Sequence, residues 1–186
     1  MSGSIVVTEF MSLDGVIEDP VGMENSGLGN WTGPFQRGPE GDAFKLGELL
    51  GASALLFGRK TYDVFAAHWP QAKNDFAERM NSLPKYLASH KADAPWTNTT
   101  LIEGDLAAAA GTLKTQFDRD ILVYGSASIV HQLAPLGLID EYRLMIYPTV
   151  LGRGKKLLPD GYTAVFRTEE SRQLGGGIVL VRYRPA

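Results

Sequence analysis

The sequence predicts an α/β protein in which helices cover both faces of a mixed, mostly parallel sheet, giving three layers. Short apolar runs of strand length alternate with longer segments of helical character along the chain, which is the pattern of such sheets. Two of these runs lead through glycine directly into a helical segment. Two strand-like segments near the C-terminus, 165–172 and 177–184, are typical of an antiparallel pair that closes the sheet.

Strands are expected where short apolar runs stop at glycine, proline or polar residues. Before the C-terminal pair, and in chain order, they run Ser4 to Phe10, Ala54 to Phe57, Tyr86 to Ser89, Thr99 to Glu103, Ile121 to Tyr124 and Glu141 to Tyr147. The segment from Ile121 to Tyr124 is apolar throughout, as expected of a strand that is buried on both faces.

Helices are expected where apolar residues recur at helical spacing. They are predicted for Asp42 to Leu50, from Arg59 onward, and for Asn74 to Leu83, Leu106 to Phe117 and Ser128 to Leu136. Asp105 is a suitable N-cap for the alanine-rich fourth helix, and Pro84 separates the third helix from the next strand. The stretch from Glu18 to Gly41 is rich in glycine, proline and asparagine, which predicts a long loop of the kind that often carries function.

Composition excludes several classes of function. The chain has 186 residues, 44% of them apolar, and neither a linker nor a repeat, so we predict one domain spanning residues 1–186. A net charge of −3 argues against a nucleic-acid partner, which normally requires a basic face. No signal peptide and no run of about 20 apolar residues is present, so no membrane segment is expected and the cytoplasm is the default location.

Metal, thiol and serine chemistry are not predicted. The chain has no cysteine, and its histidines lie too far apart for a known ligand spacing: His68, His90 and His131. The segment from Gly125 to Ile129 does not match the pattern of a nucleophile elbow, and Gly154 with Lys155 does not complete a Walker A loop.

Two junctions between a strand, a glycine and a helix are candidates for phosphate binding. The first spans Leu55 to Tyr62 and the second spans Leu122 to Ile129. Glycine allows a sharp turn and a close approach, and the following helix presents unpaired N–H groups to an anion. Further donors are available from Arg59, Lys60, Thr61, Ser126 and Ser128. Two such junctions in one small domain suggest a diphosphate nucleotide.

Five motifs in a fixed order resemble those of a known family. They are Met11-Ser12-Leu13-Asp14-Gly15, Gly58-Arg59-Lys60-Thr61-Tyr62, Tyr124-Gly125-Ser126, Leu138-Ile139-Asp140-Glu141 and Pro148-Thr149-Val150-Leu151-Gly152-Arg153-Gly154. The chain resembles the dihydrofolate reductase-like fold, and more closely its branch that contains the reductase domain of bacterial riboflavin biosynthesis. The resemblance covers nearly the whole chain, and the order of the motifs carries it more than any single one.

The resemblance implies a homodimeric reductase that uses NADPH as hydride donor to a small heterocyclic substrate. The implied cofactor contacts are Gly58, Arg59, Lys60 and Thr61 for phosphates, Ser89, His90 and Lys91 for the adenosine 2′-phosphate, and Gly125, Ser126, Ala127 and Ser128 for the pyrophosphate. Cations at the 2′-phosphate would favour NADPH over NADH. The family usually has a second glycine where this chain has Ser126 and Ala127, and a Cβ is tolerated there only if the backbone avoids positive φ.

Two carboxylic acids are candidates to supply a proton during hydride transfer. Asp42 precedes Gly58 by sixteen positions, much as the acidic residue of dihydrofolate reductases precedes its own glycine, and burial in an apolar pocket would raise its pKa. An ordinary acid in the first turn of a helix is an equally good interpretation. Asp14 follows a strand end, where α/β sheets place ligands, although an Asp-Gly turn without chemistry is also common.

Two further groups of residues are candidates for substrate binding. Trp31, Phe35 and Trp69 could stack on a flat ring, although aromatic residues at such positions often cap the core. Leu151, Gly152 and Arg153 could reach a substrate phosphate, with a solvated basic turn as the alternative.

Three functional interpretations remain open. The first is reduction of a phosphoribosylamino-pyrimidine, which requires a cationic substrate site, and the second is reduction of a folate or another pteridine. The third is a catalytically silent binding or regulatory module, because a fold does not fix a function.

Overall fold

The chain alternates strands and helices as predicted, and the computed structural model describes residues 2–186. The strands are β1 (Ser4–Ser12), β2 (Ala54–Gly58), β3 (Lys85–Ala88), β4 (Thr99–Ile102), β5 (Asp120–Tyr124), β6 (Glu141–Tyr147), β7 (Phe166–Gln173) and β8 (Val179–Pro185). The α-helices are α1 (Gly38–Gly51), α2 (Arg59–His68), α3 (Asp75–Ser82), α4 (Leu106–Gln116) and α5 (Ala127–Leu133). Short 3₁₀ turns, which the sequence did not predict, are η1 (Trp69–Gln71), η2 (Ala134–Leu136) and η3 (Gly175–Gly177).

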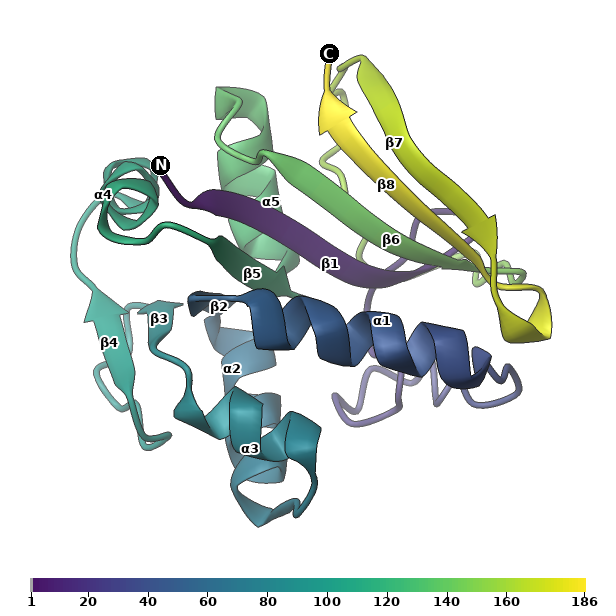
Figure 1. Cartoon of the computed structure of the whole chain (residues 1–186), viewed down its shortest axis with the longest axis horizontal. Helices are drawn as coiled ribbons and strands as arrows, with labels where there is room; N and C mark the ends of the chain where they lie inside the picture. The colour runs from purple at the N-terminus through teal and green to yellow at the C-terminus, as the bar shows by residue number, and fades with distance from the viewer. Residues whose placement is uncertain (1) are drawn as a thin grey trace.

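All eight strands form a single sheet in the order β4-β3-β2-β5-β1-β6-β8-β7 (Figure 1). The strands from β4 to β6 pair in parallel, and β8 pairs antiparallel with both β6 and β7. The predicted mixed, mostly parallel sheet with an antiparallel C-terminal pair is therefore confirmed. No helix within residues 2–186 is long and apolar enough to cross a membrane.

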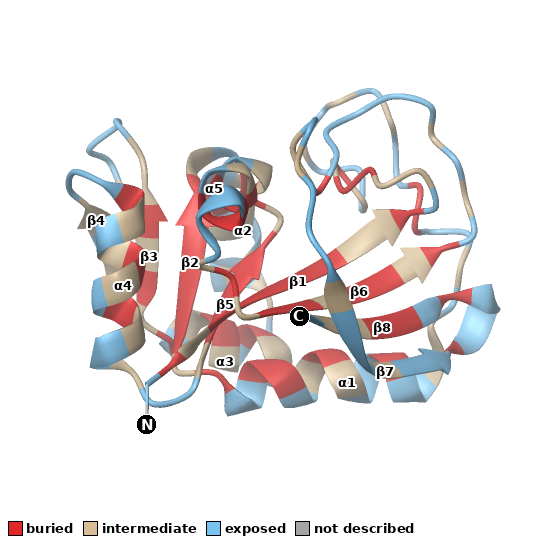
Figure 2. Cartoon of the chain, turned by 90° about the horizontal axis from the view of Figure 1, so that it is seen from above, coloured by how far each residue is buried: buried red, intermediate tan, exposed pale blue. Residues whose placement is uncertain are grey.

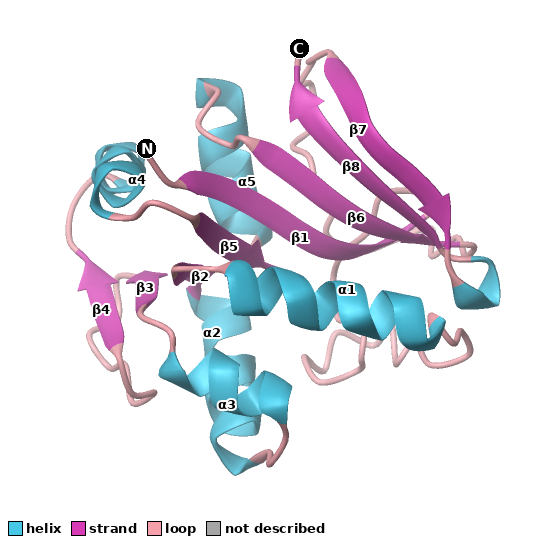
Figure 3. Cartoon of the chain, in the orientation of Figure 1, coloured by secondary structure: helices cyan, strands magenta, loops and turns pink. Residues whose placement is uncertain are grey.

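Helices cover both faces of this sheet (Figure 3). On one face, Leu49 of α1, Tyr62 of α2 and Met80 of α3 are buried in a common apolar core. On the other face, Leu113 of α4 and Val130 of α5 belong to a second core. The three predicted layers follow from this arrangement, and parallel pairing brings the C-terminal ends of β1, β2 and β5 to one edge of the sheet.

Element boundaries differ from the prediction at two places that matter for function. Helix α1 begins at Gly38, four residues before the predicted start at Asp42, because Pro39 is tolerated in the first turn, where its missing N–H has no intrahelical partner. Helix α5 begins at Ala127, because Gly125 and Ser126 both have positive φ and therefore turn the chain before it.

The predicted long loop lies between β1 and α1 and is anchored at several points. The buried carboxylate of Asp19 accepts hydrogen bonds from the amides of Glu24 (2.8 Å) and Ser26 (3.1 Å). The indole N–H of Trp31 donates to the carbonyl of Glu18 at 2.9 Å. In Figure 2 this loop and the one that follows β6 gather at one end of the sheet. These contacts give a segment without regular structure a defined shape beside the strand ends.

A buried carboxylate holds β6 and β8 together through three arginines. Glu141, of which 1% is exposed, pairs with Arg143 at 2.8 Å, with Arg182 at 2.7 Å and with Arg184 at 2.9 Å. Arg143 also contacts Asp120 at 2.7 Å. Although burial opposes ionisation of Glu141, its arginine partners dominate and lower its pKa to about 2.

Candidate functional site

A cavity of about 820 Å³ opens between the helices α1, α2 and α3 and the C-terminal ends of β1 and β5. This volume is in the range of small-molecule sites. Its apolar wall includes Phe10, Leu46, Val64, Phe65, Trp69 and Phe76. A wall rich in aromatic side chains at the edge of a parallel sheet suits a flat organic ligand.

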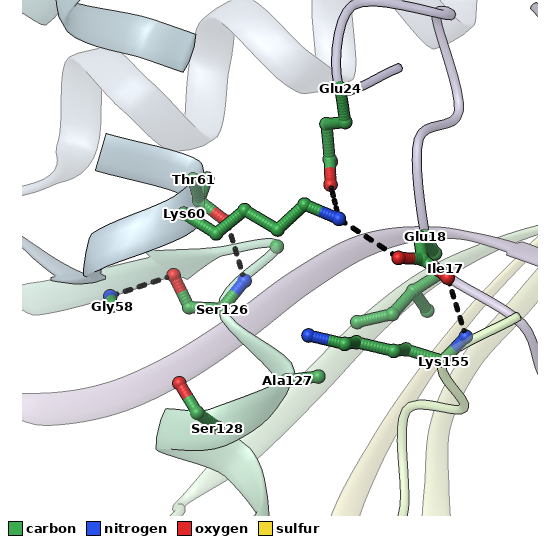
Figure 4. Close-up of a pocket in the computed structure, with 11 residues that line it drawn as sticks. Ile17, Glu18, Glu24, Gly58, Lys60, Thr61, Ser126, Ala127, Ser128 and Lys155 are labelled. Carbon is green, nitrogen blue, oxygen red and sulfur yellow. Dashed lines mark hydrogen bonds and ion pairs between the residues drawn. The ribbon is translucent and has the colours of Figure 1, made fainter. Parts of the chain in front are cut away.

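A smaller hollow of about 50 Å³ adjoins the cavity at the two strand–glycine–helix junctions (Figure 4). We call this hollow the cradle; its walls include Gly58, Lys60, Ser126, Ala127, Ser128 and Lys155. Ile17, Glu24, Thr61 and Gly125 line both the cradle and the cavity. The two spaces therefore form one continuous site, in which the two junctions lie side by side.

The two junctions lock together through hydrogen bonds between residues 65 or more positions apart. The amide of Ser126 donates to Thr61 Oγ1 at 2.9 Å, and the amide of Gly58 donates to Ser126 Oγ at 3.0 Å. A Cβ at Gly125 would lie 2.6 Å from Thr61 Oγ1, and a Cβ at Gly58 would lie 2.8 Å from Ser128 Oγ. Glycine is therefore required at position 125, where φ is also +52°, whereas a Cβ at position 58 would require Ser128 to reorient its hydroxyl.

Ser126 adopts the left-handed conformation that the sequence treated as doubtful for a residue with a Cβ. Its φ is 53° and its ψ is 46°, directly after Gly125 with φ 52°. This conformation costs a residue other than glycine about 1–2 kcal/mol. The hydroxyl of Ser126 compensates by accepting the Gly58 amide, which glycine could not do.

Charged groups of both signs surround the cradle. Lys60 Nζ lies 2.8 Å from Glu18 and 3.0 Å from Glu24, so its charge is paired across the cradle with the long loop. The hydrogen bond from Lys60 lowers the pKa of Glu18. In Figure 4 the side chain of Lys155 reaches toward Ser126, and within residues 2–186 its ammonium group forms no ion pair. Lys155 is thus the cation that the cradle can offer without breaking a contact.

Arg59 does not line the cradle, contrary to the role predicted for it. Its Nε donates to Ser89 Oγ at 2.8 Å, and one of its terminal nitrogens donates to the carbonyls of Lys91 and Asp93 at 2.8 Å each. Arg59 therefore holds the segment after β3 beside the start of α2. The predicted residues His90 and Lys91 are exposed on that segment.

The predicted burial of Asp42 is wrong. Its side chain is 65% exposed and pairs with Arg37 at 2.6 Å at the rim of the cavity. The reason is the orientation of α1, because its buried side is formed by Gly41, Lys45, Glu48 and Leu49 and does not include Asp42. Water and an arginine surround this carboxyl, so it lacks the apolar setting that a proton donor would require.

Asp14 lies outside the cavity and has a structural role. Its carboxylate accepts hydrogen bonds from Ser12 Oγ at 2.6 Å and from the amides of Leu151 at 3.1 Å and Gly152 at 2.8 Å. These bonds lower the pKa of Asp14 to about 2, the one from Ser12 most of all. A carboxyl group that stays ionised cannot donate a proton at neutral pH.

The residues predicted to bind substrate lie in three different places. Trp31 and Phe35 pack against Tyr147 in a core cluster, with ring centroids 5.6 Å and 5.7 Å from that of Tyr147, and neither residue lines the cavity. The amides of Leu151 and Gly152 donate hydrogen bonds to the Asp14 carboxylate. Arg153 donates to the carbonyl of Gly27 at 2.9 Å. Of the six residues predicted to bind substrate, one lines the cavity, namely Trp69.

Sequence reasoning missed two buried polar groups in the cavity wall. Within residues 2–186, Glu9 Oε1 and the Tyr124 hydroxyl are buried side-chain atoms without a hydrogen-bond partner. Burial raises the pKa of Glu9 well above its usual value and raises that of Tyr124. The available signal was the single charged residue in the strand from Ser4 to Phe10.

Further buried polar groups lie on α1 and β1 beside the cavity. Lys45 and Glu48 of α1 form a buried ion pair, and the hydroxyl of Thr8 donates to Glu48 at 2.7 Å. Lys45 Nζ also lies 2.7 Å from Thr8 Oγ1 and 4.9 Å from the centre of the Tyr124 ring. Residues 2–186 contain no group of three histidine or acidic side chains that could hold a metal ion.

Comparison with known proteins identifies relatives over nearly the full length. The profile of the RibD C-terminal domain matches residues 4–180. The uncharacterized protein YyaP of Bacillus subtilis strain 168 is 30% identical over 135 residues, which cover 69% of this chain and 72% of YyaP.

Three solved structures share the fold. A putative riboflavin biosynthesis protein from Shewanella sp. PV-4 superposes with a TM-score of 0.78 at 19% identity, covering 100% of this chain and 99% of that one. A pyrimidine reductase-like protein from Corynebacterium diphtheriae gives 0.66 at 14% identity, covering 99% and 92%. RibD from Acinetobacter baumannii gives 0.68 at 17% identity, and this chain spans 58% of it. The predicted dihydrofolate reductase-like, RibD-type fold is confirmed.

Proposed function

The chain belongs to the family of RibD C-terminal domains, and from that premise we propose that it is an NADPH-dependent reductase. The proposed reaction is hydride transfer to a small heterocycle of the pyrimidine or pteridine type. The observation that carries the proposal is the continuity of the cradle with the cavity through Thr61 and Gly125. A dinucleotide with its phosphates in the cradle would extend its nicotinamide end into the cavity, where a second ring can lie against it.

The residues present fit such a dinucleotide. The cradle has glycine at the two positions where a Cβ would collide with the opposite junction. Helix α2, ten residues long, begins at Arg59 after Gly58, which as N-cap offers no side chain, so amides of its first turn are available to a phosphate. Lys155 and Lys60 would balance the charge of the phosphates, and Lys60 would exchange Glu18 and Glu24 for them.

The segment after β3 would recognise the adenosine end. Arg59 holds this segment through the Ser89 hydroxyl and the Lys91 carbonyl, and the side chains of His90 and Lys91 are exposed beside it. When bound, the reduced nicotinamide supplies a hydride. The protein's own residues position the acceptor ring against the aromatic wall and exclude water from it.

A fluorescence titration with NADPH and with NADH tests the proposal. Excitation of the tryptophans, of which Trp69 lines the cavity, should give energy transfer to the bound reduced nicotinamide. We expect saturable binding of NADPH, with NADH at least about 10-fold weaker, because charge-assisted contacts are worth about 1.5–3 kcal/mol. The proposal fails if neither nucleotide binds.

Substitutions should separate the two phosphate contacts. Lys60→Ala should weaken NADPH and NADH alike, by about 10-fold, because the cradle would hold phosphates that both share. The double variant His90→Ala, Lys91→Ala should weaken NADPH by about 10-fold and leave NADH unchanged. Arg119→Ala is the control, since this exposed arginine lies at the opposite ends of the strands, before β5. Equal losses of both nucleotides in the double variant would contradict the assignment of the 2′-phosphate.

A further inference from the structure

We infer that Glu9 is the proton donor of this site and that the acceptor it serves is an unphosphorylated heterocycle that contains a C=N bond. The inference rests on the proposed function and adds to it a catalytic residue and a substrate class. It is drawn from the position of one buried carboxyl group and from the way the cations around the cavity are paired.

Glu9 lies at the C-terminal end of β1, in the wall of the cavity. It is 5% exposed, and within residues 2–186 its Oε1 atom has no hydrogen-bond partner. A buried polar atom without a partner costs about 1–3 kcal/mol, so such atoms are uncommon unless a ligand completes them. An acceptor ring in the cavity would supply the missing partner.

The groups that face Glu9 favour the protonated form of its carboxyl. Burial is the largest influence, and the carboxylates of Glu48 on α1 and Glu24 on the long loop also raise its pKa. Lys45 opposes them, but its ammonium group is bound to Glu48. The amide of Gly125 on the β5 side favours the ionised form least of all. A neutral carboxylic acid beside an apolar ligand can donate its proton.

Tyr124 places a second unpartnered polar atom in the same wall. Its hydroxyl is buried, and Glu48 and Glu9 add to the effect of burial in raising its pKa, while Arg143 opposes them. The phenol therefore stays a neutral donor or acceptor. Two neutral polar groups in an otherwise aromatic wall suit the edge of a heterocycle, with a ring nitrogen or carbonyl toward each.

The cavity offers no free cation for a phosphate ester on the acceptor. Among the described residues that line it, Arg37 is paired with Asp42, and Lys45 is paired with Glu48 and is buried. His68 is exposed at the rim, where its ring packs on Trp69 at 4.8 Å. A phosphate dianion in this part of the site would have to displace Asp42 from Arg37 or Glu48 from Lys45 to gain a cationic partner.

Reduction of the C=N bond takes one proton from Glu9 and one hydride from the cofactor. The O–H bond of Glu9 breaks as an N–H bond forms on the acceptor nitrogen, and Glu9 becomes a carboxylate. The carbon of the same C=N bond receives the hydride that the reduced cofactor supplies. Glu9 regains a proton from solvent after the product leaves, because its charged form is disfavoured by burial.

The test compares Glu9→Gln with the matched control Glu103→Gln, which alters an exposed acid that follows β4, away from the cavity. An infrared spectrum of the protein without ligand at pH 7 should contain a protonated-carboxyl band that Glu9→Gln removes and Glu103→Gln retains. This readout does not depend on turnover. Glu9→Asp, which keeps the acid, should retain such a band if Glu9→Gln proves poorly folded.

Kinetics test the role and the substrate class together. The substrates are a ribosylamino-pyrimidinone, its 5′-phosphate and 7,8-dihydropterin. We expect kcat/KM to be at least about 10-fold higher for the ribosylamino-pyrimidinone than for its 5′-phosphate. Glu9→Gln should lower kcat about 100-fold with KM nearly unchanged, within the range for a general acid. It should also abolish the fall in kcat that the wild type shows as pH rises and Glu9 ionises.

The opposite results would exclude the proton donor or the substrate class separately. Full activity of Glu9→Gln, or a wild-type spectrum without the band, would exclude Glu9 as proton donor. Preference for the 5′-phosphate would exclude the proposed substrate class while leaving the reductase proposal intact. Failure of both nucleotides to bind in the titration would remove the reductase proposal itself, and the infrared result would stand apart from it.

Discussion

Replacing Glu141 with alanine is expected to destabilise the protein by about 3 kcal/mol at neutral pH. The substitution removes the buried carboxylate that three arginines share across β6 and β8, and it leaves Arg143 with Asp120 as its near partner. Breaking a buried ion pair from one side costs about 3–5 kcal/mol, and solvent reaching Arg182 and Arg184 places the expected value at the lower end. Chemical denaturation monitored by tryptophan fluorescence measures the loss.

The same carboxylate should make stability depend on acid. Its pKa is about 2 in the folded protein against 4.5 without these partners, so its contribution is complete above pH 5 and disappears as the pH falls toward 2. Glu141→Ala should therefore flatten the acid side of the stability curve. Glu169→Ala is the matched control, because Glu169 forms an exposed pair with Arg167 on β7 and should leave the unfolding midpoint nearly unchanged. Equal effects of the two substitutions would show that burial of the network is unimportant.

Replacing Gly125 with alanine is expected to disrupt the cradle and destabilise the fold together. The new Cβ would lie 2.6 Å from Thr61 Oγ1 and 3.0 Å from Thr61 Cγ2, at a position where φ is +52°. Overpacking costs about 1–3 kcal/mol and the left-handed backbone about 1–2 kcal/mol. Displacement of Thr61 would also break its bond to the Ser126 amide, so nucleotide binding should weaken by more than about 10-fold.

Gly104→Ala separates the cost of the left-handed backbone from the cost of the steric collision. Gly104 has a φ of +83°, and nothing lies within 4 Å of a Cβ built there, so alanine encounters the backbone cost without the collision. Its stability should fall by about 1–2 kcal/mol, and its nucleotide titration should match the wild type. If Gly125→Ala binds NADPH as tightly as Gly104→Ala does, the interlocked junctions are not needed for cofactor binding.

The fold was predictable because its signals are local and repeated. The parallel strands β2 and β5 are short apolar runs, and the two junctions are marked by glycines that lie close to Thr61 and Ser128. The start of α1 was mispredicted because Gly38 and Pro39 indicate a loop by composition, although both are compatible with the beginning of a helix. Asp42 was expected in a pocket because of its spacing to Gly58, and that spacing does not show which side of α1 is buried.

The sequence predicted the backbone turns of the candidate site, but it did not predict which partners its charged side chains contact. The cradle follows from chain motifs, whereas the partners of each side chain depend on segments far away in the sequence. Asp14 is engaged by amides at Leu151 and Gly152, and Arg59 by carbonyls beyond β3, which no local pattern shows. Glu9 went unnoticed because a strand of apolar residues draws attention to burial and not to its one acid.

The interlock of the two junctions ties ligand occupancy to the integrity of the central sheet. Because Thr61 and Ser126 meet only when β2 and β5 are paired, an unfolded chain cannot present the cradle to a nucleotide. A ligand that binds only the native state at 100 times its Kd adds about 2.7 kcal/mol of stability. The proposed cofactor would thereby act as a folding ligand, and the cellular lifetime of this protein would follow the nucleotide pool around it.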